Sequence, residues 1–196
     1  MADPTLRVLT VTISDLRKRF ADEAGKRLDA ELTAAGLTVV RHATVADEPG
    51  HIRDLVRTVA STNAADAIIL TGGTGITPRD QTYEALATLF EKQIDGFGEA
   101  FRRLAFDAMG PRSMYFRASA GVIEQVPVFS LPGNAQAVLL GVQQLIIPTL
   151  RHAVALATGR DTHTVGPSSK KEGERPSTRD VTRDVPADAP SSPSST

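Results

Sequence analysis

The chain has 196 residues, of which 41% are hydrophobic and 23% charged, a composition typical of a soluble globular protein with one domain and a tail. Its formal net charge is −1, so no broad basic surface supports binding to nucleic acid. The sequence contains no cysteine, which excludes disulfides, thiolate nucleophiles and thiolate metal ligands.

The predicted strands are β-branched or continuously apolar, and in chain order they are 7–13, 37–45, 67–70 and 126–131. The predicted helices have apolar residues at helical spacing, and they are 21–35, 52–59, 80–90, 97–110 and 134–147. Strands and helices therefore alternate, which predicts an α/β fold with a mostly parallel sheet.

Three details of this pattern are less regular. Pro127 indicates that its strand begins there or lies at a sheet edge, because proline has no N–H for the ladder. Pro148 is expected to stop the long helix that precedes it and is a candidate first-turn residue of a last short helix. Residues 110–122 match neither pattern and are left unassigned.

The composition changes near Thr158. Residues 161–196 are rich in Ser and Pro and contain no aromatic residue, so they cannot bury enough apolar surface to offset the entropy of ordering. We expect an α/β domain over residues 1–160 and a disordered Ser/Pro-rich tail over residues 161–196.

The apolar segments are too interrupted for a membrane-spanning helix, which needs about 20 apolar residues. The longest one lies between Ala135 and Leu150 and contains several glutamines, Gly141 and Pro148. The first residues lack the apolar core of a signal peptide. We therefore expect a cytoplasmic protein that does not span a membrane.

Polar or glycine-bearing clusters follow four of the predicted strands. They are Ser14 with Asp15, Asp47 with Glu48, residues 71–75 and residues 130–134. In open α/β sheets, ligands bind outside the carboxyl ends of the strands. Because parallel strands share one direction, these clusters are expected to converge on one edge of the sheet.

The sequence Thr-Gly-Gly-Thr-Gly at 71–75 is a candidate anion-binding loop. Its glycines allow close approach of the backbone to a ligand, and a predicted helix N terminus follows. A tight strand-to-helix turn is the alternative. The segment is not a P-loop, because no Lys follows Gly75, and Pro78 replaces the third glycine of a dinucleotide fingerprint.

Asp47 and Asp80 are the candidate carboxylates of this edge. A helix cap is the alternative for Asp80, and a surface turn is the alternative for Asp47. Two carboxylates beside a phosphate site require a cation, and Mg²⁺ binds through one or two carboxylates plus substrate phosphates. Together they indicate phosphoryl or nucleotidyl transfer, in which catalysis is mostly positioning and charge neutralisation.

Residues 130–134, Ser-Leu-Pro-Gly-Asn, form a second candidate loop. Gly133 permits close approach, and Asn134 can cap the long helix, so the segment is either a second anion-binding helix N terminus or a capped connection. No metal cluster is expected from the histidines, which are His42, His51, His152 and His163.

Three motifs, in this order and spacing, resemble the signature of the molybdopterin-binding family, which includes the bacterial MogA and MoaB proteins. They are residues 71–75, Arg-Asp-Gln-Thr-Tyr-Glu-Ala at 79–85, and residues 130–134. The resemblance extends from about Leu6 to Thr158, and residues 96–102 and 114–122 are similar to the MoaB branch in particular.

Two positions depart from the family pattern. Ala135 stands where many relatives have Pro, and Ala46 replaces the Pro that usually precedes the aspartate at 47. Both changes loosen the backbone without removing a functional group.

The resemblance implies a three-layer α/β sandwich and an ATP- and Mg²⁺-dependent reaction in molybdenum-cofactor biosynthesis. The phosphate of molybdopterin attacks the α-phosphorus of ATP, AMP is transferred, and pyrophosphate leaves. The alternative is a catalytically weak molybdopterin carrier or scaffold, as for some MoaB proteins. The resemblance also implies a homotrimer or hexamer and a metal-insertion protein that takes up the product.

The resemblance assigns roles residue by residue. Asp47 and Asp80 match the catalytic aspartates and are the expected Mg²⁺ ligands, and Ser14 and Asp15 match a pair near the nucleotide. The residues expected to bind molybdopterin and its phosphate are Thr71, Gly72, Gly73, Thr74, Gly75, Ser130, Pro132, Gly133 and Asn134.

Overall fold

The computed structural model describes residues 5–14 and 22–160, and these form a six-stranded sheet with helices. The strands are β1 (Arg7–Ile13), β2 (Thr38–Val45), β3 (Ala67–Thr71), β4 (Lys92–Gln93), β5 (Ser119–Ile123) and β6 (Val126–Leu131). Their order across the sheet is β2-β1-β3-β6-β5-β4. The pairs β1–β2, β1–β3 and β3–β6 are parallel, whereas β5 pairs antiparallel with β6 and β4. The predicted α/β fold with a mostly parallel sheet is confirmed.

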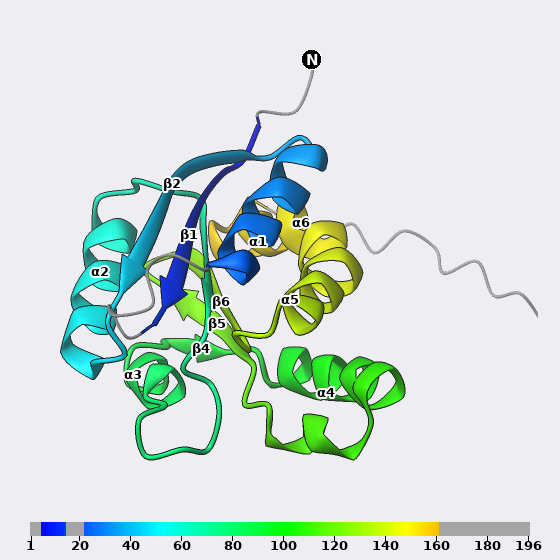
Figure 1. The fold of residues 1–196 in the computed structure, drawn as a ribbon. Coiled ribbons are helices and arrows are strands. Elements are labelled where there is room, and N and C mark those ends of the chain that lie inside the picture. The colour runs from blue at the N-terminus through cyan, green and yellow to red at the C-terminus, as the bar shows by residue number, and fades with distance from the viewer. Residues whose placement is uncertain (1–4, 15–21, 161–196) are drawn as a thin grey trace, which may run out of the picture. The chain divides into compact units, whose positions relative to one another are not determined.

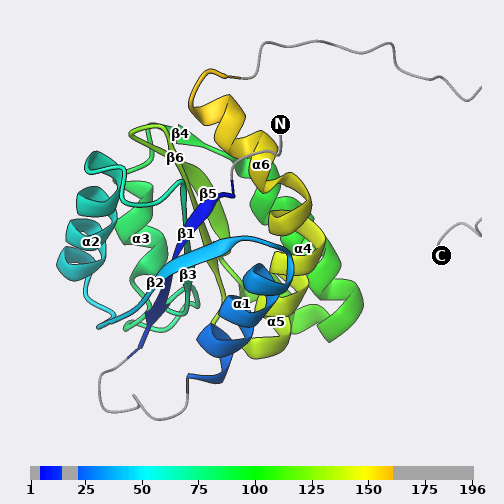
Figure 2. The same ribbon diagram turned by 90° about the horizontal axis from the view of Figure 1, so that it is seen from above.

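Helices cover both faces of the sheet (Figure 1; Figure 2). One face carries α2 (Pro49–Ser61) and α3 (Thr82–Ala87), and the other carries α1 (Glu23–Ala34), α4 (Asp95–Met109), α5 (Ala135–Gly141) and α6 (Ile147–Ala157). Each face has its own apolar core, with Ile52 and Leu70 fully buried in the first and Leu28 and Phe101 in the second. The arrangement is a three-layer sandwich.

Successive side chains of β1 point to opposite faces of the sheet. Leu9 and Val11 belong to the core beneath α2, and Val8 belongs to the core on the α1 side. Thr10 and Thr12 share the face of Val8 and are buried. Buried hydroxyls need hydrogen-bond partners, and α1 and β2 supply them.

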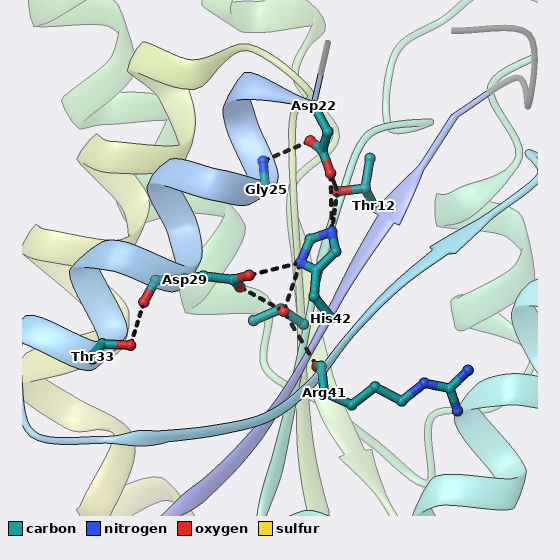
Figure 3. A network of polar contacts seen from close by, with 8 residues as sticks. Thr12, Asp22, Gly25, Asp29, Thr33, Arg41 and His42 are labelled. Carbon is teal, nitrogen blue, oxygen red and sulfur yellow. Dashed lines mark hydrogen bonds and ion pairs between the residues drawn. The ribbon is translucent and has the colours of Figure 1, made fainter. Parts of the chain in front are cut away.

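A network of polar side chains joins α1 to the sheet (Figure 3). In the imidazole of His42 on β2, Nε2 lies 2.9 Å from Asp22 Oδ2 and Nδ1 lies 3.0 Å from Asp29 Oδ2. Thr12 donates to Asp22 and Thr10 donates to Asp29, each over 2.6 Å. Each ring nitrogen of His42 therefore has a carboxylate partner, one at the N-cap of α1 and one within the helix.

The N-cap of α1 is part of this network. Asp22 Oδ1 accepts a hydrogen bond of 2.8 Å from the backbone N–H of Gly25. A Cβ at Gly25 would lie 2.5 Å from His42 Cε1 and 2.6 Å from Thr12 Oγ1. The close approach of α1 to the sheet therefore requires glycine at this position.

The two prolines match the sequence-based expectations in part. Pro127 is the second residue of β6, so the strand begins next to it, as expected, but β6 is an interior strand and the alternative of an edge position is wrong. The strand tolerates it because β3 pairs with β6 only from Val128 onward. Pro148 stands in the first turn of a last helix, α6, as expected. It does not stop the helix before it, because a π-helical turn, η3 (Val142–Ile146), joins α5 to α6 and widens the helix just before the proline ring.

The helical segment from Ala135 to Ala157 has 23 residues and is long and apolar enough to cross a membrane by length and composition. Val138, Ile146 and Leu150 on this segment are buried in the core that also contains α1 and α4. The segment therefore packs against the core of the domain. It extends to Ala157, beyond the apolar run between Ala135 and Leu150 that the sequence showed.

The unassigned residues 110–122 contain the 3₁₀ helix η2 (Pro111–Tyr115) and most of β5. The antiparallel strands β4 and β5 were not predicted, and α3 is shorter than the helix expected over 80–90. The predicted tail, residues 161–196, lies outside the described residues, as does Asp15.

Candidate functional site

A cleft of about 860 Å³ opens beyond the carboxyl ends of β1 and β3. It is lined by Ile13, Ser14, Ala46, Asp47, Glu48, Pro49, Gly72, Gly73, Pro78, Arg79, Asp80, Gln81 and Gly133. The loops after β1, β2, β3 and β6 each contribute, so at least one described residue from each of the four predicted clusters lies at this edge of the sheet. This is where parallel α/β sheets bind their ligands.

The loop after β3 turns back on itself through two glycines. Gly72 has φ +101° and Gly73 has φ +62°, values that side chains strongly disfavour. A Cβ at Gly73 would lie 2.7 and 2.8 Å from the two carboxylate oxygens of Asp47. In the part of the chain that the structure describes, the N–H groups of Gly73, Thr74 and Gly75 have no hydrogen-bond acceptor. Of these three residues Gly73 lines the cleft, so its free N–H is the one placed to meet a phosphate there.

The loop after β6 packs directly against the loop after β3. The N–H of Gly72 donates to the carbonyl of Leu131 over 3.0 Å, and Thr71 Oγ1 donates to the carbonyl of Pro132 over 3.0 Å. A Cβ at Gly133 would lie 3.3 Å from Gly72 Cα. The two glycine loops therefore form a continuous backbone surface at the base of the cleft.

Asp47 reaches the cleft from the end of β2. Its Oδ1 accepts a hydrogen bond of 3.1 Å from the N–H of Gln81, the N-cap residue of α3. The next N–H, that of Thr82, donates to the carbonyl of Gly73 over 2.9 Å. The N–H groups of Gln81 and Thr82 at the start of α3 are thus already bonded within the protein.

Asp80 lies in the loop before α3 and also lines the cleft. Its Oδ2 accepts hydrogen bonds from the N–H of Thr77 (2.8 Å) and from Thr77 Oγ1 (2.6 Å). Because α3 begins at Thr82 with Gln81 as N-cap, the helix-cap alternative for Asp80 is wrong. A Cβ at Gly75 would lie 2.7 Å from Asp80 Oδ2, so glycine leaves room for the carboxylate.

The cleft concentrates negative charge. Burial raises the pKa of Asp47, and repulsion from Asp80 and Glu48 raises it further, against the lowering effect of the Gln81 N–H and of Arg79. A divalent cation between the carboxylates would remove this repulsion, and two carboxylates with phosphate oxygens form a typical Mg²⁺ ligand set. The oxygen donors present therefore fit Mg²⁺.

Several residues expected to bind molybdopterin do not line the cleft. Thr71, Thr74 and Ser130 are almost fully buried, and the Ser130 hydroxyl lies 2.8 Å from that of Ser119. Asn134 caps α5, its Oδ1 accepting from the N–H of Gln136 over 2.8 Å. These side chains hold the loops in place. Gly75 and Pro132 also lie outside the lining, whereas Gly72, Gly73 and Gly133 line the cleft with the two carboxylates.

Sequence reasoning missed Arg117, which lies between η2 and β5. Its Nε donates to the carbonyl of Gly75 over 2.9 Å, and its guanidinium pairs with Glu84 of α3. This arginine lies in the stretch that matched no periodic pattern. The stretch was noted only for its similarity to the MoaB branch, and the sequence assigned Arg117 no role, because its side-chain contacts are with residues 33 to 43 positions earlier.

The topology and the cleft define a three-layer α/β protein whose candidate ligand site is built from two glycine loops and two carboxylates. The sequence matches the family described as "Probable molybdopterin binding domain" over residues 7–152, and the chain belongs to this family.

Among curated proteins, the chain is 40% identical to Molybdenum cofactor biosynthesis protein B of Bacillus subtilis (strain 168), over 78% of this chain and 91% of that protein. It is 35% identical to the protein of the same name of Escherichia coli (strain K12), over 74% and 85%. The chain is therefore a relative of proteins of molybdenum-cofactor biosynthesis.

Solved structures give the same picture. A crystal structure of Molybdenum cofactor biosynthesis protein B matches with a TM-score of 0.77 and 37% identity, covering 81% of this chain and 99% of that one. The tungsten cofactor synthesizing protein MoaB from Pyrococcus furiosus matches with a TM-score of 0.68 and 34% identity, over 80% and 99%. These matches support a role in molybdenum-cofactor biosynthesis and molybdopterin as the ligand.

Proposed function

We propose that this protein is a molybdopterin adenylyltransferase that uses ATP and Mg²⁺. The observation that carries the proposal is the convergence of Asp47 and Asp80 beside a glycine loop with unbonded N–H groups. Such a site places hydrogen-bond donors for an anion beside ligands for a cation. Nucleotidyl transfer needs both, and simple binding of a pterin does not.

In the proposed reaction, an oxygen of the molybdopterin phosphate forms a bond to the α-phosphorus of ATP. The bond from the α-phosphorus to the oxygen that bridges to the β-phosphorus breaks, and pyrophosphate leaves with that oxygen. The N–H group of Gly73, which lines the cleft, would orient one phosphate, and Asp47 and Asp80 would hold the cation. When bound, Mg²⁺ offsets the charge that develops on the phosphate oxygens.

The test is pyrophosphate release from purified protein given molybdopterin, ATP and Mg²⁺. Asp80→Asn keeps the shape of the side chain but removes its charge, so we expect turnover to fall by about a hundredfold or more. Asp54→Asn is the matched control, because Asp54 is an exposed carboxylate of α2 that does not line the cleft.

The outcomes separate the candidate functions. Release that needs molybdopterin and Asp80 supports the transferase. If the protein binds molybdopterin but releases no pyrophosphate from ATP, the alternative function, a molybdopterin carrier or scaffold, replaces the transferase. Wild-type turnover in Asp80→Asn would refute the role given to that residue.

The described surface also suits a homo-oligomer, and the product suits a later protein of the pathway. Large apolar side chains are exposed at Ile76, Met114 and Phe106, with exposed fractions of 65%, 64% and 52%. Exposed apolar residues of this size are consistent with a homotrimer or hexamer. Light scattering behind size exclusion measures the mass directly. A metal-insertion protein would take up the adenylylated product, and a pull-down with that protein tests the step.

A further inference from the structure

Arg117 lies outside the cleft, yet it contacts the loop that carries Asp80. Its Nε donates to the carbonyl of Gly75 over 2.9 Å, and its Nη2 lies 3.5 Å from the carbonyl of Asp80. Its own N–H donates to the carbonyl of Thr74 over 3.2 Å. One side chain therefore reaches both ends of the 75–80 loop.

The guanidinium is itself held from the other side. It pairs with both carboxylate oxygens of Glu84 on α3 and lies 5.0 Å from the ring centre of Tyr83. The hydrogen bond from Arg117 is the main cause of a lowered pKa of Glu84, which keeps that carboxylate ionised. A planar group with five N–H donors makes these contacts at once, which a lysine ammonium cannot do.

The 75–80 loop depends on this contact because it has few others. Its remaining hydrogen bonds are local: Asp80 accepts from Thr77, and the side chain of Gln81 donates to the carbonyl of Pro78. Residues 76–79 are exposed. Among the described residues, Arg117 is the one group distant in sequence that donates hydrogen bonds to the loop.

We propose that Arg117 is a positioning residue that sets the place of the Asp80 carboxylate opposite Asp47, and thereby the affinity of the cleft for a divalent cation with nucleotide phosphates. The cation part rests on the proposed function. The structural part does not, because it concerns only how the 75–80 loop is held.

The experiment compares three variants with wild type. Arg117→Lys keeps the charge and loses the forked geometry. Arg117→Ala loses both, and added guanidinium ion can replace the missing group. Glu84→Gln, the matched control, removes the ion pair and leaves the hydrogen bonds of Arg117 to the Gly75 and Asp80 carbonyls.

Two readouts are independent of turnover. Hydrogen exchange at the N–H groups of Thr77 and Gln81 reports the Asp80 and Asp47 carboxylates, which accept from them. Binding of Mn²⁺ with a non-hydrolysable ATP analogue, followed by electron paramagnetic resonance, reports the cation site. Urea unfolding records any general loss of stability.

For Arg117→Lys we expect exchange at Thr77 to accelerate, and Mn²⁺ affinity to fall, by about tenfold or more, as for other residues that orient metal ligands. Guanidinium should restore affinity to Arg117→Ala but leave Arg117→Lys unchanged. Glu84→Gln should change affinity by a few-fold at most, because exposed ion pairs are weak.

Wild-type exchange at Thr77 in both Arg117 variants would overturn the proposal. So would faster exchange throughout the domain without rescue by guanidinium, which would make Arg117 a general stabilising residue. A wild-type protein that binds no Mn²⁺ with nucleotide would instead refute the adenylyltransferase and the cation part, while the exchange data still decide how the loop is held.

Discussion

Gly73→Ala tests whether the glycine loop and Asp47 depend on each other. The new Cβ would clash with Thr82 Oγ1 and lie within 2.8 Å of the Asp47 carboxylate oxygens. An alanine at φ +62° costs about 1–2 kcal/mol. Overpacking of this kind adds about 1–3 kcal/mol. The total expected loss in the free energy of unfolding is about 2–5 kcal/mol.

Gly36→Ala is the matched control for the backbone cost. Gly36 has φ +76°, and a Cβ there would have nothing within 4 Å. Urea unfolding followed by circular dichroism should place Gly73→Ala about 1–3 kcal/mol below this control. Pyrophosphate release should fall in Gly73→Ala alone, because the displaced group is Asp47. If the two variants were equally stable and active, crowding against Asp47 would be refuted.

Two carboxylates should give opposite dependences of stability on pH. The pKa of Asp47 is raised above its ordinary value of 3.8, so the folded protein loses stability as pH rises through the window above 3.8. Asp47→Asn can still accept a hydrogen bond from the N–H of Gln81. This variant should be more stable than wild type at pH 7 and should lose that advantage below pH 3.8. Burial raises the pKa of Asp22, but hydrogen bonds, first that from Thr12, bring the pKa below 3.8. The ionised Asp22 therefore stabilises the folded protein above pH 3.8, and this stabilisation is lost as pH falls below that value. Asp22→Asn should therefore be less stable than wild type at pH 7, and urea titrations that gave both variants the same pH dependence would contradict this reasoning.

Regular periodicity predicted most of the fold. The strand expected over 7–13 is β1 with the same bounds, and the apolar spacing of residues 52–59 predicted most of α2. These elements bury one face or both faces, so the pattern of their side chains follows the geometry of the backbone. The antiparallel strands β4 and β5 escaped because β4 has two residues and β5 follows an irregular 3₁₀ turn.

Proline positions show a second limit. A single sequence says that proline lacks an N–H, but not whether the neighbouring strand extends far enough to need it, as at Pro127. It also cannot show that a π-helical turn will make room for Pro148. Both outcomes depend on tertiary packing, which overrides local preference.

The sequence predicted those parts of the candidate site in which a glycine or carboxylate directly follows a strand. Glycines and carboxylates directly after strands could be assigned to one edge, because strand direction fixes where they lie. Side-chain burial could not be assigned in the same way: Ser130 belongs to a conspicuous motif, yet its hydroxyl faces Ser119 in the interior. Arg117 shows the reverse case: it lies in a stretch noted only for its resemblance to the MoaB branch, and its side-chain contacts, which are all long-range, gave it no predictable role.

The contact between Gly72 and Gly133 gives the cleft a base made of main chain. A main-chain surface has no side chain that mutation can exchange, and any substitution large enough to change it would force the two loops apart. Ligand preference in such a protein can therefore diverge only through the surrounding walls, where Ser14, Glu48 and Arg79 lie. The main-chain base therefore limits the shape of the ligands that fit the cleft, and substitutions in the walls can change which of those ligands the protein prefers.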